Sequence, residues 1–195
     1  GADSLLVCAP SRGERVILQT LGPEFAGVIV CDGWKPYASF TKNIQRCWAH
    51  LLREADFAAR EEPEAAGFAA ALRRMLASGK AAASLPEPER REAWRKLRRW
   101  MGIWASREYR GPKAQKLAIK AANGGEHWFT FVLVPGVPPT NNAAERSLRE
   151  TVVQRKIIGT LRSPRGAFAH ETIMSCLATW ENKGLDVYEE MGKLL

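Results

Sequence analysis

The stretch Gly27–Cys31 constrains the fold most, because it reads GVIVC and is followed directly by Asp32-Gly33. A short, continuous run of β-branched residues is typical of a strand that is buried on both faces of a parallel sheet. Parallel strands need crossover connections, which are usually helices, so the run predicts an α/β fold. Asp32 follows the carboxyl end of this strand, where open α/β sheets have their ligand-binding and catalytic residues. Asp-Gly is also a common turn sequence. Both interpretations of Asp32 stay open at this point.

The other predicted elements are short near the start of the chain and helical after it. Apolar runs predict a buried strand over Ser4–Ala9 and a further strand within Asn43–Trp48. Helical spacing or composition predicts helices over residues 15–21, 34–40 and 49–60 and a helical insertion over residues 61–126, in which prolines mark helix starts. The apolar run 128–134 fits a strand or a buried helix, and we favour the helix.

The segment Thr140–Arg149 reads TNNAAERSLR and predicts a helix start after Pro138-Pro139. Glu145 then lies in the first turn, and Arg149 lies one turn later on the same face. The spacing from Asn142 to Glu145 also fits a capping box, in which Glu145 only bonds backbone amides. The neighbouring asparagines and arginines favour metal and phosphate chemistry instead.

Two further helical patterns follow this segment. The first helix is expected to continue to about Lys156 and to pack through Ala144, Leu148 and Val152. A second helix is expected over residues 167–183, ending at Gly184 and burying Ile173, Leu177 and Trp180. Asp186 has the position of a cap for a last short helix.

Positive charge is concentrated in two parts of a chain whose net charge is +8. Residues 87–120 carry eleven basic and four acidic side chains, and residues 146–165 carry six basic and one acidic. Local clusters of this kind favour a polyanionic partner such as DNA over general solubility. For residues 90–120, a solvated helix face is the alternative.

The four cysteines lie far apart and form no CxxC pair, which fits buried free thiols in a reducing cytoplasm. No apolar run reaches the length of a membrane span. Cys47 and His50 form a CxxH pair, but a zinc site needs two further ligands, for which His127 and Cys176 are candidates only in principle. We therefore expect Cys47 to pack and His50 to contact DNA or orient a ligand.

Four blocks of the chain, CDGWKPY, IQRCWAHLLREA, PPTNNAAERSLR and RKIIGTLRSPRG, occur in an order and spacing that resemble the insertion-sequence sixty-six family of DDE transposases. The resemblance implies an incomplete ribonuclease H-like α/β fold, mostly helical overall, with partial sheet 1–48, helical insertion 49–135 and final helices 136–195. It also implies two Mg²⁺ or Mn²⁺ ions, with Asp32 and Glu145 as metal-binding catalytic carboxylates. The expected DNA contacts are His50, Asn141, Asn142, Arg146, Arg149, Arg155, Lys156, Arg162 and Arg165.

The sequence departs from the family pattern in its first aspartate, which family members carry on an earlier strand. Asp3 matches that position poorly, so we expect a C-terminal fragment or truncated element that does not cut DNA alone. The function expected of the parent is DNA strand cleavage and joining. The alternatives are a non-catalytic DNA-binding or regulatory remnant and a generic RNA-processing nuclease of the same fold, and homo-oligomerisation is left open.

Overall fold

The computed structural model describes residues 3–9, 11, 13–159, 161 and 163–194, except for the side chains of Glu150, Arg155 and Ile158. The chain forms two compact units. One unit contains Pro23–Asn141, and the other combines Gly1–Gly22 with Asn142–Leu195. We call them the central unit and the terminal unit.

The central unit begins with a small parallel sheet, as the sequence predicts. Strand β1 (Ile29–Cys31) pairs in parallel with β2 (Ile44–Arg46), and Ile29 lies opposite Ile44. Helix α2 (Lys35–Phe40) lies in the connection between them. Ile44 and Cys31 are buried, which agrees with the apolar pattern of both runs.

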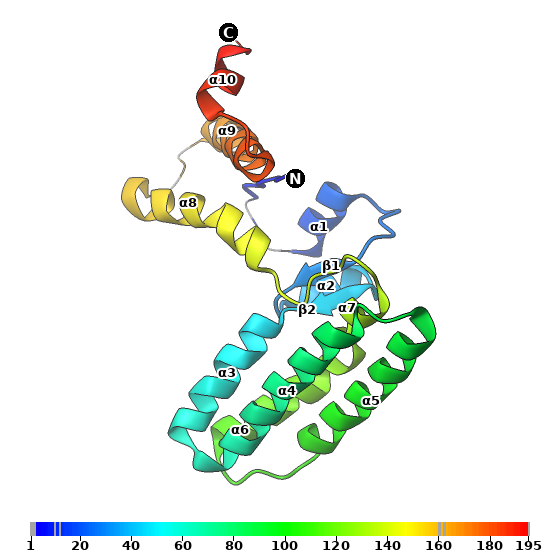
Figure 1. Ribbon diagram of the computed structural model, residues 1–195. Coiled ribbons are helices and arrows are strands. Elements are labelled where there is room, and N and C mark those ends of the chain that lie inside the picture. Colours follow the sequence, from blue (N-terminus) through cyan, green and yellow to red (C-terminus); the bar gives the residue numbers. More distant parts are fainter. Residues whose placement is uncertain (1–2, 10, 12, 160, 162, 195) are drawn as a thin grey trace. The chain divides into compact units, whose positions relative to one another are not determined.

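Four helices of the central unit pack as a bundle (Figure 1). Helix α3 contacts α4 and α6, and α5 contacts the same two helices, so the four close around one core. Alanine fills many of the buried positions, which lets the helix axes approach closely. The helices are α3 (Trp48–Glu61), α4 (Ala66–Ala82), α5 (Glu87–Ala105) and α6 (Pro112–Gly124), with a 3₁₀ turn η1 (Pro63–Ala65) between α3 and α4.

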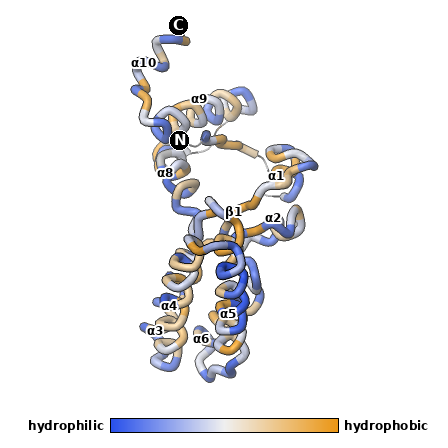
Figure 2. Tube along the Cα trace, turned by 45° about the vertical axis from the view of Figure 1, so that its right-hand side comes forward, coloured by the Kyte–Doolittle hydropathy of each residue, from blue (hydrophilic) through white to orange (hydrophobic). Residues whose placement is uncertain are grey.

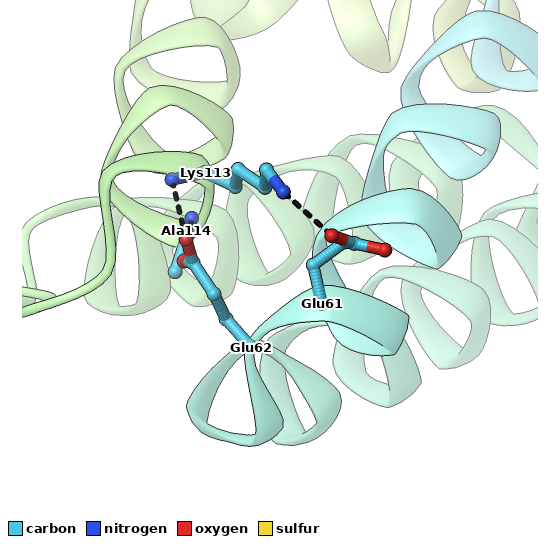
Figure 3. A network of polar contacts seen from close by, with 4 residues as sticks. All are labelled: Glu61, Glu62, Lys113 and Ala114. Carbon is cyan, nitrogen blue, oxygen red and sulfur yellow. Dashed lines mark hydrogen bonds and ion pairs between the residues drawn. The ribbon is translucent and has the colours of Figure 1, made fainter.

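Carboxylates after α3 cap the distant start of α6 (Figure 3). Glu62 accepts hydrogen bonds from the amides of Lys113 at 3.1 Å and Ala114 at 2.8 Å. These amides belong to the first turn of α6, where they lack partners within the helix. Lys113 also pairs with Glu61 at 2.8 Å. A Cβ atom at Gly111 would overlap the Glu62 carboxylate, so a larger residue there would force this side chain to shift.

A buried glutamine holds the end of the central unit against the sheet. Gln45 accepts a hydrogen bond from the amide of Phe131 at 2.8 Å and donates to the Trp128 carbonyl at 3.2 Å. The indole of Trp48 donates to the same carbonyl at 2.5 Å. These bonds fix η2 (Gly125–Trp128) and α7 (Thr130–Leu133), which confirms a helical rather than extended conformation for this apolar run.

The terminal unit is formed by helices from both ends of the chain. Helix α8 ends before Gly159, and α9 ends at Gly184, whose φ of 69° gives the left-handed cap that the sequence predicts. Asp186 caps the last helix by accepting from the amides of Tyr188 and Glu189. The helices are α1 (Glu14–Leu21), α8 (Asn142–Ile158), α9 (Pro164–Lys183) and α10 (Val187–Gly192).

The prediction of a buried strand over Ser4–Ala9 is wrong. The segment is extended, but it lies along α9 instead of in a sheet. Its amides donate to side chains of α9: Ser4 to Thr179 at 2.9 Å, Leu6 to Ser175 at 2.8 Å and Cys8 to Glu171 at 2.9 Å. A two-residue step along extended chain is about 6.6–6.8 Å and a four-residue step along a helix about 6 Å, so the two repeats match.

The terminal unit buries few large side chains. Among its described residues only Ile17 and Met174 are buried. The predicted packing stripe of Ala144, Leu148 and Val152 is exposed, and Ile173 is 57% exposed. The predicted packing of Ala144, Leu148, Val152 and Ile173 is therefore wrong, because periodicity identifies an apolar face but not what covers it. Leu177 and Trp180 are half-buried.

Candidate active site

Asp32 follows β1 directly, at the carboxyl end of the parallel pair. Its Oδ1 accepts a hydrogen bond from the amide of Trp34 at 2.9 Å, which orients the carboxylate through a two-residue turn. The preceding carbonyl, that of Cys31, accepts from the amide of Cys47 at 2.8 Å. The side chain of Asp32 is half-buried, so it combines a fixed position with access from solvent.

Arg46 lies beside this turn, and the sequence did not single it out. It is the register partner of Cys31 on β2, and its Nη1 lies 3.3 Å from the position that a Cβ on Gly33 would take. Its Nε atom is buried and has no hydrogen-bond partner among the described residues. A guanidinium group therefore stands next to the Asp32 turn, where it is suited to bind a phosphate oxygen. The sequence alone could not show that Arg46 lies beside Asp32, because this depends on the register between β1 and β2.

The Cys31 thiol is inert at neutral pH. Burial raises the pKa of Cys31 to about 12, while the Arg46 guanidinium opposes the shift and the Asp32 carboxylate adds to it. The thiol therefore stays protonated, as expected for a structural buried cysteine. The sequence-based prediction of buried free thiols is thus confirmed for Cys31 and Cys47 but is wrong for Cys8 and Cys176, which are only half-buried.

The CxxH pair begins helix α3 and holds a distant loop. Cys47 is buried, and its Sγ accepts a hydrogen bond from the amide of Asn141 at 3.2 Å. The amide of Trp48 donates to the Pro139 carbonyl at 3.0 Å. Cys47 thus packs as predicted, and it also fixes the loop that leads to α8. His50 is half-buried in the first turn of α3.

Glu145 lies in the first turn of α8, as the sequence predicts, and is half-buried. The basic side chains that follow it are exposed, and in the described part of the chain none of them has a carboxylate within ion-pair distance. They are Arg146, Arg149, Lys156 and Arg165. The side chain of Arg155 and all of Arg162 lie outside the described residues. Asn141 is half-buried and Asn142 is exposed.

Much of the positive charge on α5 is compensated locally. Figure 2 shows the hydrophilic residues along this helix. Arg91 pairs with Glu87 at 2.7 Å, and Arg98 lies 3.6 Å from Glu126 and stacks on Trp94. Glutamates also pair with Arg95 and Lys96 of α5, and with Lys113 and Lys120 of the neighbouring α6. The basic side chains of α8, which have no carboxylate partner among the described residues, are therefore the stronger attraction for a polyanion.

The predicted site residues divide between the two units. Asp32, His50 and Asn141 belong to the central unit, and Glu145, Asn142 and the predicted arginines and lysine belong to the terminal unit. A metal site shared by Asp32 and Glu145 remains a prediction.

The sequence of the chain is similar to those of transposases. A family model described as "Transposase IS66 family" matches residues 4–169. The chain therefore belongs to the IS66 family of transposases, which confirms the resemblance found in the sequence. No curated protein and no solved structure matches the chain. None of the helices in the described residues has the length and apolar character that a membrane crossing requires.

Proposed function

We propose that this chain is part of the catalytic domain of a DDE transposase, which cleaves and joins DNA strands by phosphoryl transfer. The observation that carries the proposal is the placement of Asp32 at the carboxyl end of β1, with its carboxylate oriented by Trp34 and with Arg46 alongside. The family membership makes DNA the expected substrate.

We further propose that the sheet is part of a ribonuclease H-like fold. Support comes from the parallel pairing of β1 with β2 through α2 and from the large helical bundle that follows. A protein of the cytoplasm is the matching expectation, because its DNA substrate is there.

Asp32 and Glu145 would hold Mg²⁺ or Mn²⁺ in the proposed site. Both side chains offer carboxylate oxygens, the donors that these ions prefer, and both are only half-buried. A bound ion pair supplies activation of the attacking oxygen and stabilisation of the leaving one. The protein's own residues orient the carboxylates and bind phosphate: Trp34 fixes Asp32, Arg46 faces the same turn, and Arg146 and Arg149 follow Glu145.

Divalent-metal binding by the chain itself tests this proposal. We expect Mn²⁺ binding, measured by electron paramagnetic resonance, to weaken on the order of tenfold or more in Asp32→Asn and in Glu145→Gln. Glu108→Gln is the matched control, because Glu108 is exposed and has no ion-pair partner among the described residues. Equal Mn²⁺ binding by all four proteins would contradict the proposal.

A second candidate is a non-catalytic DNA-binding protein. It is favoured by the exposed basic side chains of α8, which have no carboxylate partner among the described residues. This candidate predicts DNA binding without specific Mn²⁺ binding at Asp32. Measuring both Mn²⁺ binding and DNA binding therefore separates the two candidates.

A further inference from the structure

Arg46 is a half-buried cation at the end of β2 in the central unit. Its Nη1 atom lies 3.3 Å from the position that a Cβ on Gly33 would take, so the guanidinium covers the turn after β1. Its Nε atom is buried and has no hydrogen-bond partner, and among the described residues no carboxylate lies within ion-pair distance of the group. Burying a charge without pairing it costs free energy, which an anion bound to this group would offset.

His127 lies beside the same strand. The 3₁₀ turn η2, which contains His127, contacts β2. The hydroxyl of Thr130, just after this turn, donates a hydrogen bond to the carbonyl of Ile44 at 2.5 Å. The imidazole of His127 also forms a hydrogen bond with the backbone of Ile44. Ile44 precedes Arg46 by two residues, so the imidazole and the guanidinium are both fixed to this short strand.

The charged groups that face His127 are mainly positive. Burial lowers the pKa of His127, and the nearby cations Arg46 and Lys42 lower it further, against the Glu126 carboxylate. Glu126 is itself paired with Arg98 of α5 at 3.6 Å, and α7 has no ionisable side chain. Lys42 is exposed and has no ion pair among the described residues. Two cations without carboxylate partners in the described part of the chain therefore lie near this imidazole.

We propose that Lys42, Arg46 and His127 form a binding site for a phosphate group. The Arg46 guanidinium supplies a planar pair of donors, Lys42 supplies an exposed charge, and His127 becomes a third cation when it is protonated. A bound anion offsets the positive charges that disfavour the imidazolium, so phosphate binding and protonation of His127 favour each other. The site requires no metal ion. That the phosphate belongs to a DNA strand rests on the proposed function.

An NMR titration of His127 in the whole chain, without metal ions, tests this site. The probe is dimethyl phosphate, which resembles a phosphate within a strand and keeps one negative charge throughout the titration. Sodium chloride at equal ionic strength is the reference. We expect the probe to raise the pKa of His127 toward the usual value of 6.5. A pKa of His127 that is the same in both salts would overturn the proposal.

Three substitutions locate the response to the probe. In Arg46→Gln the rise should disappear, and the dissociation constant of the probe should increase on the order of tenfold. Lys42→Gln should reduce the rise, and because this side chain is exposed, the fold should not depend on it. Arg74→Gln is the matched control, since it removes the same charge from an exposed position on α4 and should leave the rise unchanged. Equal rises in all four proteins would refute a site at Arg46.

Two further probes separate a strand phosphate from free phosphate. We expect a single-stranded DNA oligonucleotide to raise the pKa of His127 at a lower total phosphate concentration than inorganic phosphate does, because neighbouring strand phosphates increase the local concentration. A rise with inorganic phosphate alone would overturn the assignment to DNA. Because these titrations contain no metal, loss of the phosphate response is distinguishable from failure of the proposed function, which is measured by Mn²⁺ binding at Asp32 and Glu145.

Discussion

The backbone amide of Trp48 donates a hydrogen bond to the carbonyl of Pro139 at 3.0 Å. This bond joins two blocks of sequence that both belong to the family pattern, the CWAH turn and the PPTNN loop. The adjacent bond from the Asn141 amide to Cys47 Sγ, at 3.2 Å, strengthens the same connection. The start of α3 therefore fixes the last residues before the helix that carries Glu145.

We expect Cys47→Ala to destabilise the chain. The substitution removes a buried sulfur atom and leaves the Asn141 amide without its acceptor, so the free energy of unfolding should fall by about 1–2 kcal/mol. Urea denaturation measures this change. Hydrogen exchange at the Asn141 amide should accelerate in the same variant. Cys8→Ala is the control, since the Cys8 side chain is only half-buried; equal losses in both variants would contradict the role given to Cys47.

We expect Glu62→Ala to weaken the start of α6. The Glu62 carboxylate accepts from the amides of Lys113 and Ala114, and loss of a helix cap costs about 0.5–2 kcal/mol. Glu62→Gln keeps an acceptor oxygen but loses the negative charge near the helix N-terminus, so its effect should be smaller. Thermal unfolding compares the two variants with Glu108→Ala, an exposed glutamate in the same unit. An unchanged Tm in Glu62→Ala would show that water replaces the cap without loss.

His127 gives the chain a pH dependence. Burial lowers the pKa of His127 below its usual 6.5, and Arg46 and Lys42 add to this effect against the opposing Glu126 carboxylate and a backbone hydrogen bond with Ile44. The unfolded state therefore binds a proton first as the pH falls. The stability that His127 contributes is complete above about pH 6.5 and is lost as the pH falls toward the lowered pKa.

Comparison of urea midpoints at pH 7.5 and pH 5.5 measures this contribution. We expect the loss of stability at the lower pH to be smaller in His127→Gln than in the unchanged chain. An NMR titration of the imidazole should give a midpoint below 6.5. A midpoint above that value would reverse the sign of the effect and contradict the prediction.

The sequence predicts elements better than it predicts their partners. The β-branched run at β1 and the Gly184 cap were sufficient to place a strand and a helix end, because both depend on local residue types. The apolar run Ser4–Ala9 has the same local pattern as a buried strand, but its hydrogen-bond acceptors are side chains about 170 residues away on α9. No local signal distinguishes these two cases.

The candidate site shows the same difference: the sequence predicts the local position of a residue but not its partners. Asp32 and Glu145 could be placed at a strand end and in a first helical turn from the sequence alone. Arg46 could not, because its relation to Asp32 depends on the register between β1 and β2. Residues that act through pairing across the chain need the fold before they can be recognised.

We expect the chain to bind duplex DNA with an affinity that falls steeply with salt. Neutralising about six phosphates gives a slope of about −5 in a plot of log binding constant against log salt concentration. The main contribution should come from α8, because Arg146, Arg149 and Lys156 are exposed and have no carboxylate partner among the described residues. Fluorescence anisotropy at several salt concentrations measures the slope, and a flat dependence would exclude electrostatic binding.

Substituting one arginine of α8 and one paired arginine of α5 tests whether DNA contacts α8 or responds to the total charge. Arg149→Gln should reduce the size of the slope by about 0.9, because one released counterion is lost with each phosphate contact. Arg91→Gln removes the same charge from α5, but Arg91 is already paired with Glu87 at 2.7 Å, so its loss should leave the slope unchanged. If both substitutions lower the slope equally, the DNA instead senses the total charge of the chain, and α8 is no preferred contact.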